Sequence, residues 1–349
     1  MTLLFAAVAL FSLVVQLFAQ KQEARAQKAA SKDAPPLKLV GKYEFPSDVK
    51  GNFDQLIVEL KGHRLFTTSF GLKSVVVFDL RTHTLIHTIG GIEIPHALLY
   101  RKDLNRLYVS DGGAGALKIF DGKTYDLIKS VKLLPDADAA VYDSKTKYLY
   151  VVNGGRDAEM TYSMISVIDT TSGDKIGEMK VDGHTLDAMV IETFGPNLYI
   201  NNVAKAEVEV IDRNVRTVIA SWPITLGKVN VAMALDEAHH RLFVGCRSGH
   251  IVVFDTVTGK ELQALPINKG IDDLAFDLAM KRLYAPCPAG AGTVDVYEET
   301  DPDHYRLLGQ VPSGPGGRNG RLVPELSRYF VEIPQRDSAN AEVLEYEVL

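Results

Sequence analysis

The chain has 349 residues, of which 46% are hydrophobic and 23% charged, and its formal net charge is −6. This composition is typical of a globular protein with a large core and excludes a disordered or fibrous chain. The acidic balance, without any cluster of Lys and Arg, also excludes nucleic acid as a general partner, because phosphate binding requires a concentrated basic surface. A cationic or neutral ligand is easier to accommodate.

The N-terminal region carries an apolar run over residues 3–18, followed by Ala-Arg-Ala at residues 24–26, which fits a small-x-small cleavage site. We therefore expect a signal peptide over residues 1–26 and a polar linker over 27–36. The mature chain would then be periplasmic or secreted, with no membrane span. Because the first two residues carry no positive side chain, an uncleaved N-terminal anchor is the alternative.

The rest of the chain contains a repeated unit whose first part is a Leu-aromatic-aliphatic strand after a basic or polar residue. In the last copy Tyr takes the place of Leu. Seven copies begin at Arg64, Arg106, Tyr148, Asn197, Arg241, Arg282 and Arg328. The second part is an alternating strand that ends in an acid, at residues 75–79, 117–121, 166–169, 209–212, 252–255 and 294–298. With one short strand before and one after these parts, each unit has four strands and recurs every ~40 to 50 residues, as propeller blades do.

The last unit, residues 318–349, supplies three strands before the chain stops. A strand over residues 39–45 can provide the fourth and so remove the exposed sheet edges. The sequence therefore predicts an all-β fold over residues 37–349. This fold is a seven-bladed β-propeller of four-stranded antiparallel blades, closed by an N-terminal strand that completes the last blade.

The strands at Leu149-Tyr150-Val151-Val152-Asn153 and Leu198-Tyr199-Ile200-Asn201-Asn202 resemble those of the YVTN-repeat family of β-propellers. The resemblance extends over essentially the whole mature chain and implies an exported, seven-bladed protein, often of undefined activity. WD40 repeats fit less well, because Trp222 is the single Trp of the sequence.

The start of each inner strand is expected to face the central channel, at Asp54, His96, Asp138, Asp187, Val231, Asp272 and Asn319. The ends of the second strands are expected to converge on the same face, at Ser69, Asp111, Asn153, Asn202, Cys246, Cys287 and Ile333. From these positions we predict ligand-binding roles for His96, Asp111, Asn202 and Asn319, together with Arg318. An arginine could offer its guanidinium to an anionic group of the ligand.

Carboxylates that face one channel repel each other unless they are protonated, hydrogen-bonded or neutralised by a cation. A divalent cation such as Ca²⁺ or Mn²⁺ held by Asp138, Asn153, Asp187 and Asp272 would neutralise them. The alternative is that these side chains cap turns by accepting backbone N–H bonds.

Two functions follow from these patterns. The first is a binding or scaffold protein that uses its channel face for a small ligand, a cation or a protein partner, since no defined catalytic motif is present. The alternative is a metal-dependent, lactonase-like hydrolase or lyase with the cation in the channel and His96 as acid/base. Cys246 and Cys287 occupy equivalent positions in adjacent blades, and the sequence leaves a disulfide between them open.

Overall fold

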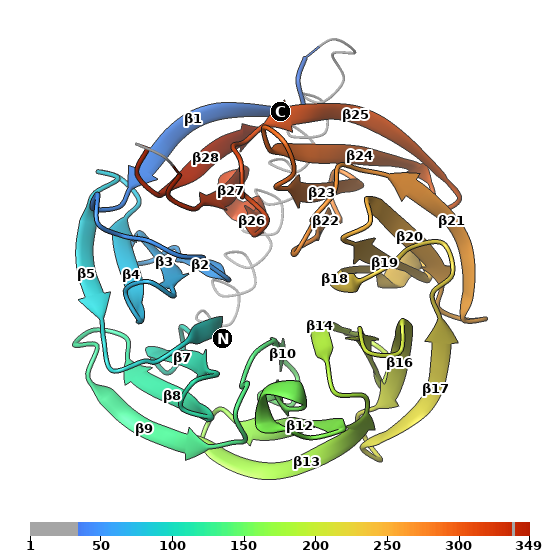
Figure 1. The fold of residues 1–349 in the computed structure, drawn as a ribbon, viewed down its shortest axis with the longest axis horizontal. Coiled ribbons are helices and arrows are strands. Elements are labelled where there is room, and N and C mark those ends of the chain that lie inside the picture. Colours follow the sequence, from blue (N-terminus) through green and yellow to red (C-terminus); the bar gives the residue numbers. More distant parts are fainter. Residues whose placement is uncertain (1–33, 337–338) are drawn as a thin grey trace, which may run out of the picture.

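The computed structural model describes residues 34–336 and 339–349, which form seven four-stranded antiparallel sheets arranged as blades around a central axis (Figure 1). This confirms the predicted seven-bladed β-propeller. The predicted signal peptide and most of the linker lie outside the described residues. Among those residues, no helix has the length and hydrophobicity that a membrane crossing requires.

Six blades follow one another along the chain. They are β2 (Leu56–Glu59), β3 (Arg64–Ser69), β4 (Ser74–Asp79) and β5 (Leu85–Ile89); β6 (Pro95–Arg101), β7 (Arg106–Asp111), β8 (Ala116–Asp121) and β9 (Leu127–Lys132); β10 (Ala140–Asp143), β11 (Tyr148–Gly154), β12 (Tyr162–Asp169) and β13 (Asp174–Asp182); β14 (Leu186–Ile191), β15 (Asn197–Asn202), β16 (Glu207–Asp212) and β17 (Thr217–Pro223); β18 (Asn230–Asp236), β19 (Arg241–Cys246), β20 (His250–Asp255) and β21 (Lys260–Pro266); β22 (Ala275–Asp277), β23 (Arg282–Cys287), β24 (Thr293–Asp301) and β25 (His304–Pro312). Short 3-10 helices η1 (Arg156–Ala158), η2 (Glu237–His239) and η3 (Pro324–Leu326) lie in connections.

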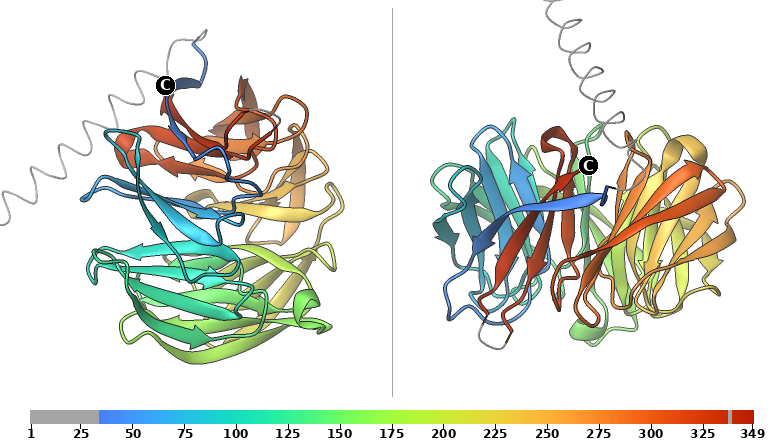
Figure 2. Two further views of the ribbon diagram at one scale, coloured as in Figure 1. Left: turned by 60° about the vertical axis from the view of Figure 1, so that its left-hand side comes forward. Right: turned by 90° about the horizontal axis from the view of Figure 1, so that it is seen from above.

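The seventh blade joins the two ends of the propeller. It consists of β1 (Leu37–Glu44), β28 (Glu342–Val348), β27 (Arg328–Ile333) and β26 (Gly320–Val323), in that order. The register of β1 and β28 runs antiparallel from Leu37↔Val348 to Glu44↔Glu342. Figure 2 shows blue β1 lying beside the red C-terminal strands. The predicted closure by an N-terminal strand is therefore confirmed.

The repeated sequence elements have distinct positions in the blade. Each Leu-aromatic element is the second strand, and each acid-terminated element is the third. Where the element ends in Asp, this acid closes the turn to the fourth strand: Asp79 accepts hydrogen bonds from the backbone N–H groups of Arg81 and Thr82 at 2.8 and 3.1 Å. Asp255 accepts equivalent bonds from Val257 and Thr258. These acids are turn residues that repeat for structural reasons.

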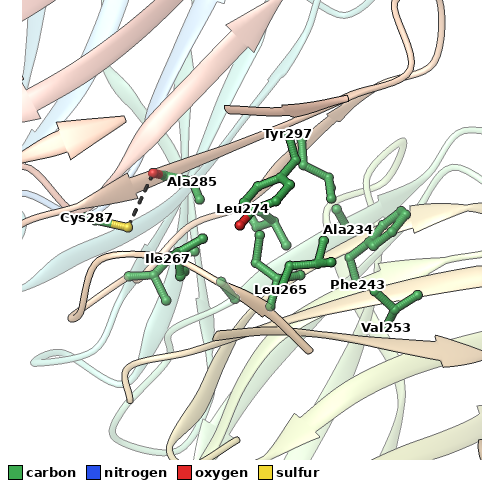
Figure 3. Packing of buried hydrophobic residues seen from close by; sticks show 13 residues of the cluster. Ala234, Phe243, Val253, Leu265, Ile267, Leu274, Ala285, Cys287 and Tyr297 are labelled. Carbon is green, nitrogen blue, oxygen red and sulfur yellow. Dashed lines mark hydrogen bonds between the residues drawn. The ribbon is translucent and has the colours of Figure 1, made fainter. Parts of the chain in front are cut away.

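The hydrophobic core lies between adjacent blades. In one cluster Phe243 and Val253, from the blade of β18 to β21, pack with Tyr297 from the blade of β22 to β25 (Figure 3). Leu283 of the second blade belongs to the same cluster. Alternation along each strand places one set of side chains against each neighbouring blade, so that each sheet is buried on both faces.

Both cysteines are buried free thiols. The Cys287 thiol lies 3.4 Å from the carbonyl oxygen of Ala285, as Figure 3 shows. Burial raises the pKa of Cys246 to about 12 and raises that of Cys287 as well. The cysteines therefore pack as small apolar side chains and are not reactive thiolates.

Candidate functional site at the channel mouth

A cavity of about 200 Å³ opens where the inner strands begin. Six of the seven positions predicted to face the channel line it: Asp54, His96, Asp138, Asp187, Asp272 and Asn319. The seventh, Val231, is buried and does not line the cavity. The regular geometry of the blades brings these six residues together from six different sheets.

His96 occupies the centre of the acidic side of the cavity. It is the second residue of β6, and its Nδ1 lies 2.5 Å from Asp54 Oδ2 and 3.2 Å from Asp138 Oδ1. Burial alone would lower the pKa of His96, but the carboxylates of Asp138 and Asp54 outweigh it and raise the pKa to about 9. At neutral pH His96 is therefore an imidazolium that bridges two carboxyl groups.

Asp138 and Asp187 are two carboxyl groups of the cavity whose pKa values lie well above the ordinary value. Burial raises the pKa of Asp138 to about 7, against the opposing charge of His96. Burial, then the charges of Asp138 and Asp272, raise the pKa of Asp187 well above its ordinary value. Asp187 accepts one hydrogen bond from the backbone N–H of Ala188 at 2.9 Å. A positively charged group placed near them would stabilise both carboxylates.

Two arginines form the basic side of the cavity. Arg318 Nε lies 3.1 Å from Asp272 Oδ2, and Arg247 forms an ion pair with the other oxygen of Asp272. Burial raises the pKa of Asp272, while the two guanidinium groups oppose that rise. Two positive side chains thus share the carboxylate of Asp272.

The strand positions did not predict two charged residues that line the cavity, Arg247 and Asp273. Arg247 follows Cys246 at the end of β19, and its long side chain reaches the cavity from the second strand. Asp273 follows Asp272, and burial raises the pKa of Asp273 to about 6. The adjacency of Arg247 to a predicted second-strand end was the signal that could have identified it.

The ends of the second strands do not converge on the cavity. Asp111, Asn153 and Asn202 are buried, and none of them lines it. Asp111 accepts bonds from the backbone N–H groups of Glu93 and Ile94, both at 2.9 Å. These side chains lie on the second strands, one strand further from the axis than the inner strands. There they form hydrogen bonds with neighbouring segments of their own blades.

Asn153 and Asn202 form such hydrogen bonds through their side-chain amide groups. Asn153 Nδ2 donates to Ser166 Oγ at 2.9 Å, and Asn202 Nδ2 donates to Glu209 Oε1 at 2.7 Å. Of the predicted cation ligands, Asp138, Asp187 and Asp272 line the cavity, whereas Asn153 does not. Asp272 is paired with two arginines. A different set does meet: one ligand atom each of Asp54, His96 and Asp138 lie within 4.8 Å of one another.

No known family model matches the chain, and no curated protein has a matching sequence. Solved structures do match. One chain of hydrazine synthase from Kuenenia stuttgartiensis is similar with a TM-score of 0.69 and 17% identity, over 82% of this chain and 93% of that one. A chain of a mitotic checkpoint complex is similar with a TM-score of 0.74 and 11% identity, over 90% and 93%. At such identities the likeness shows the β-propeller fold alone.

Proposed function

We propose that this chain is an exported, YVTN-type β-propeller that binds a small ligand carrying a positively charged group in the cavity at the channel mouth. The observation that carries the proposal is the uneven charge of the cavity. Asp138 and Asp187 lack a full countercharge on one side, and Arg247 and Arg318 share a single carboxylate on the other. A ligand with an ammonium group facing the acids and a carboxylate facing the arginines would balance both sides.

The size of the cavity narrows the ligand class. At about 200 Å³ it is smaller than the roughly 300–1,000 Å³ of pockets for drug-sized ligands. Small amines, small zwitterions and hydrated cations fit this volume. The channel face is also the surface through which propellers commonly bind ligands and partners.

Binding can be tested by calorimetric titration with glycine betaine, putrescine, succinate and Ca²⁺ as probes. We expect the three probes that carry a positive group, glycine betaine, putrescine and Ca²⁺, to bind. Succinate, which carries none, should not bind. Replacement of Asp187 by Asn should weaken the binding of the three positive probes at least tenfold, since it removes a carboxylate that faces the ligand. The matched control is Asp126→Asn, an exposed aspartate in the turn after β8. Equal affinities of the parent and Asp187→Asn would contradict the proposed site.

A second candidate function is a metal-dependent hydrolase or lyase of the lactonase-like kind, favoured by the grouping of Asp54, His96 and Asp138. Here His96 would be a metal ligand and could not also be the acid/base group. A metal would have to displace the proton that these carboxylates hold on His96. Metal analysis of the purified protein, followed by a screen of lactones and esters, would separate this function from simple binding.

The apolar segment and the Ala-Arg-Ala sequence of the N-terminal region support the proposed export. The mass of the protein recovered from outside the cytoplasm tests it. Cleavage after residue 26 is the expected result, and a full-length chain retained in the membrane would favour the uncleaved anchor.

A further inference from the structure

A second cluster of ionisable side chains lies on the opposite face of the ring from the channel mouth. Asp236 ends β18, the inner strand whose start lies at the mouth, and His239 ends the short helix η2 that follows. Glu299 lies in β24 of the next blade, and Lys281 lies in the turn before β23. The cluster therefore joins two neighbouring blades and shares no residue with the cavity described above.

The geometry within the cluster is tight. His239 Nδ1 lies 2.6 Å from Asp236 Oδ2 and 3.6 Å from Glu299 Oε1. One ligand atom of each of the three residues lies within 4.8 Å of the others. A tetrahedral site with bonds of about 2.0–2.2 Å requires ligand separations of about 3.3–3.6 Å, which small side-chain movements would produce here.

Each of the two buried carboxylates of this cluster has one oxygen without a hydrogen-bond donor from the described residues. Asp236 is fully buried and Glu299 is 5% exposed. Within the part of the chain that the structure describes, Asp236 Oδ1 and Glu299 Oε2 are buried without a hydrogen-bond donor. Leaving buried acceptors without donors costs about 1–3 kcal/mol each, and more when they are charged.

Among the described residues, Lys281 is the one lysine or arginine that pairs with the carboxylates of this cluster. Lys281 Nζ lies 3.1 Å from Asp236 Oδ2 and 3.2 Å from His239 Nδ1, so its single charge faces two carboxylates. The Lys281 side chain is 34% exposed and can turn toward solvent. A divalent ion in its place would balance the charge of both carboxylates.

We infer that Asp236, His239 and Glu299 form a binding site for a divalent transition metal of the zinc class, with Lys281 as the displaceable cation in its absence. One imidazole nitrogen and two carboxylates suit zinc, and three protein ligands leave one coordination position for water or a ligand group. The His239 side chain is 39% exposed, which gives the ion a route to the site. The bound metal would cross-link the blade of β18 to β21 with the blade of β22 to β25.

The probe is Zn²⁺ itself, titrated into the chelator-treated full chain, with Co²⁺ absorption as a second readout of tetrahedral coordination. We expect the binding of one Zn²⁺ ion to require this cluster. His239→Ala and Glu299→Gln should each weaken its binding at least tenfold. The matched control is His240→Asn, because His240 is the exposed neighbour of His239 and asparagine tolerates its left-handed backbone.

The Lys281→Met variant distinguishes a metal site from a purely structural ion-pair network. Removal of the competing ammonium should tighten Zn²⁺ binding about tenfold. If the cluster only pairs charges, Lys281→Met lowers the melting temperature and Zn²⁺ binds no more tightly than before, which overturns the inference.

The channel mouth also contains a histidine between carboxylates, so the metal must be assigned to one site. A His96→Gln chain should keep the ion under the present inference. Loss of Zn²⁺ binding in His96→Gln, with binding retained in His239→Ala, would place the metal at the channel mouth and overturn the inference. Because the His239 side chain is partly exposed, His239→Ala is expected to fold even if Glu299→Gln does not.

Discussion

Replacing Tyr43 by Ala is expected to lower the free energy of unfolding by about 3–5 kcal/mol, as removal of a buried aromatic ring typically does. Tyr43 is fully buried in β1, the strand that closes the ring. Its ring centroid lies 5.6 Å from that of Phe78 in the first blade and 6.2 Å from that of Phe330 in the last. The side chain therefore packs on both sides of the closure, and a cavity there would loosen two blades.

Tyr43→Phe is the matched control for this prediction. The Tyr43 hydroxyl donates a hydrogen bond to Glu345 Oε2 at 2.9 Å, and the Phe variant removes this bond while keeping the ring. We expect it to cost about 0.5–1.5 kcal/mol. Urea unfolding curves of both variants provide the measurement. Equal losses for Ala and Phe would show that the hydroxyl, and not the packed ring, stabilises the closure.

The metal-free protein is expected to lose stability as the pH rises from 6.5 through about 9, because of His96. The folded pKa of about 9 lies above the ordinary value of 6.5, so the stabilisation is fully present below pH 6.5 and is lost as His96 deprotonates. At about 1.4 kcal/mol per pKa unit the shift corresponds to about 3 kcal/mol. Melting curves between pH 5 and 9.5 measure it.

His96→Gln should remove this slope and lower stability at pH 6, where the imidazolium of the parent is paired. Asp138 acts over a lower range: its pKa is raised from 3.8 to about 7, so stability falls as the pH rises through that interval. Asp138→Asn should flatten the lower part of the curve. A His96→Gln chain with the pH dependence of the parent would exclude a protonated His96 in the folded protein.

The sequence was sufficient to predict the blades because their pattern is local. Each Leu-aromatic strand begins after a turn whose residues are adjacent in the chain, so seven copies could be counted directly. The same regularity placed Asp54, His96 and Asp187 at the channel mouth, since each inner strand starts at the same height.

The distance of a residue from the channel axis is not encoded in that pattern. Asn153 and Asn202 were expected at the mouth because their strands end on that face, yet they stand one strand away from the cavity. Arg247, the residue after the equivalent position Cys246, enters the cavity because its side chain is long enough to reach Asp272. Side-chain reach and pairing between blades depend on the assembled ring and could not be obtained by counting positions.

The pairing of β1 with β28 also sets an order on folding. Tyr43 and Glu345, whose side chains meet at this pairing, are 302 positions apart. Each of the six other blades consists of strands that follow one another in the chain, so those blades can form before the distant segments of the seventh blade meet. Contacts of such long sequence range are slow to form. Ring closure is thus the expected final and rate-limiting event. Until it occurs, β1 and the outer edge of β28 remain unpaired strands that another chain could capture.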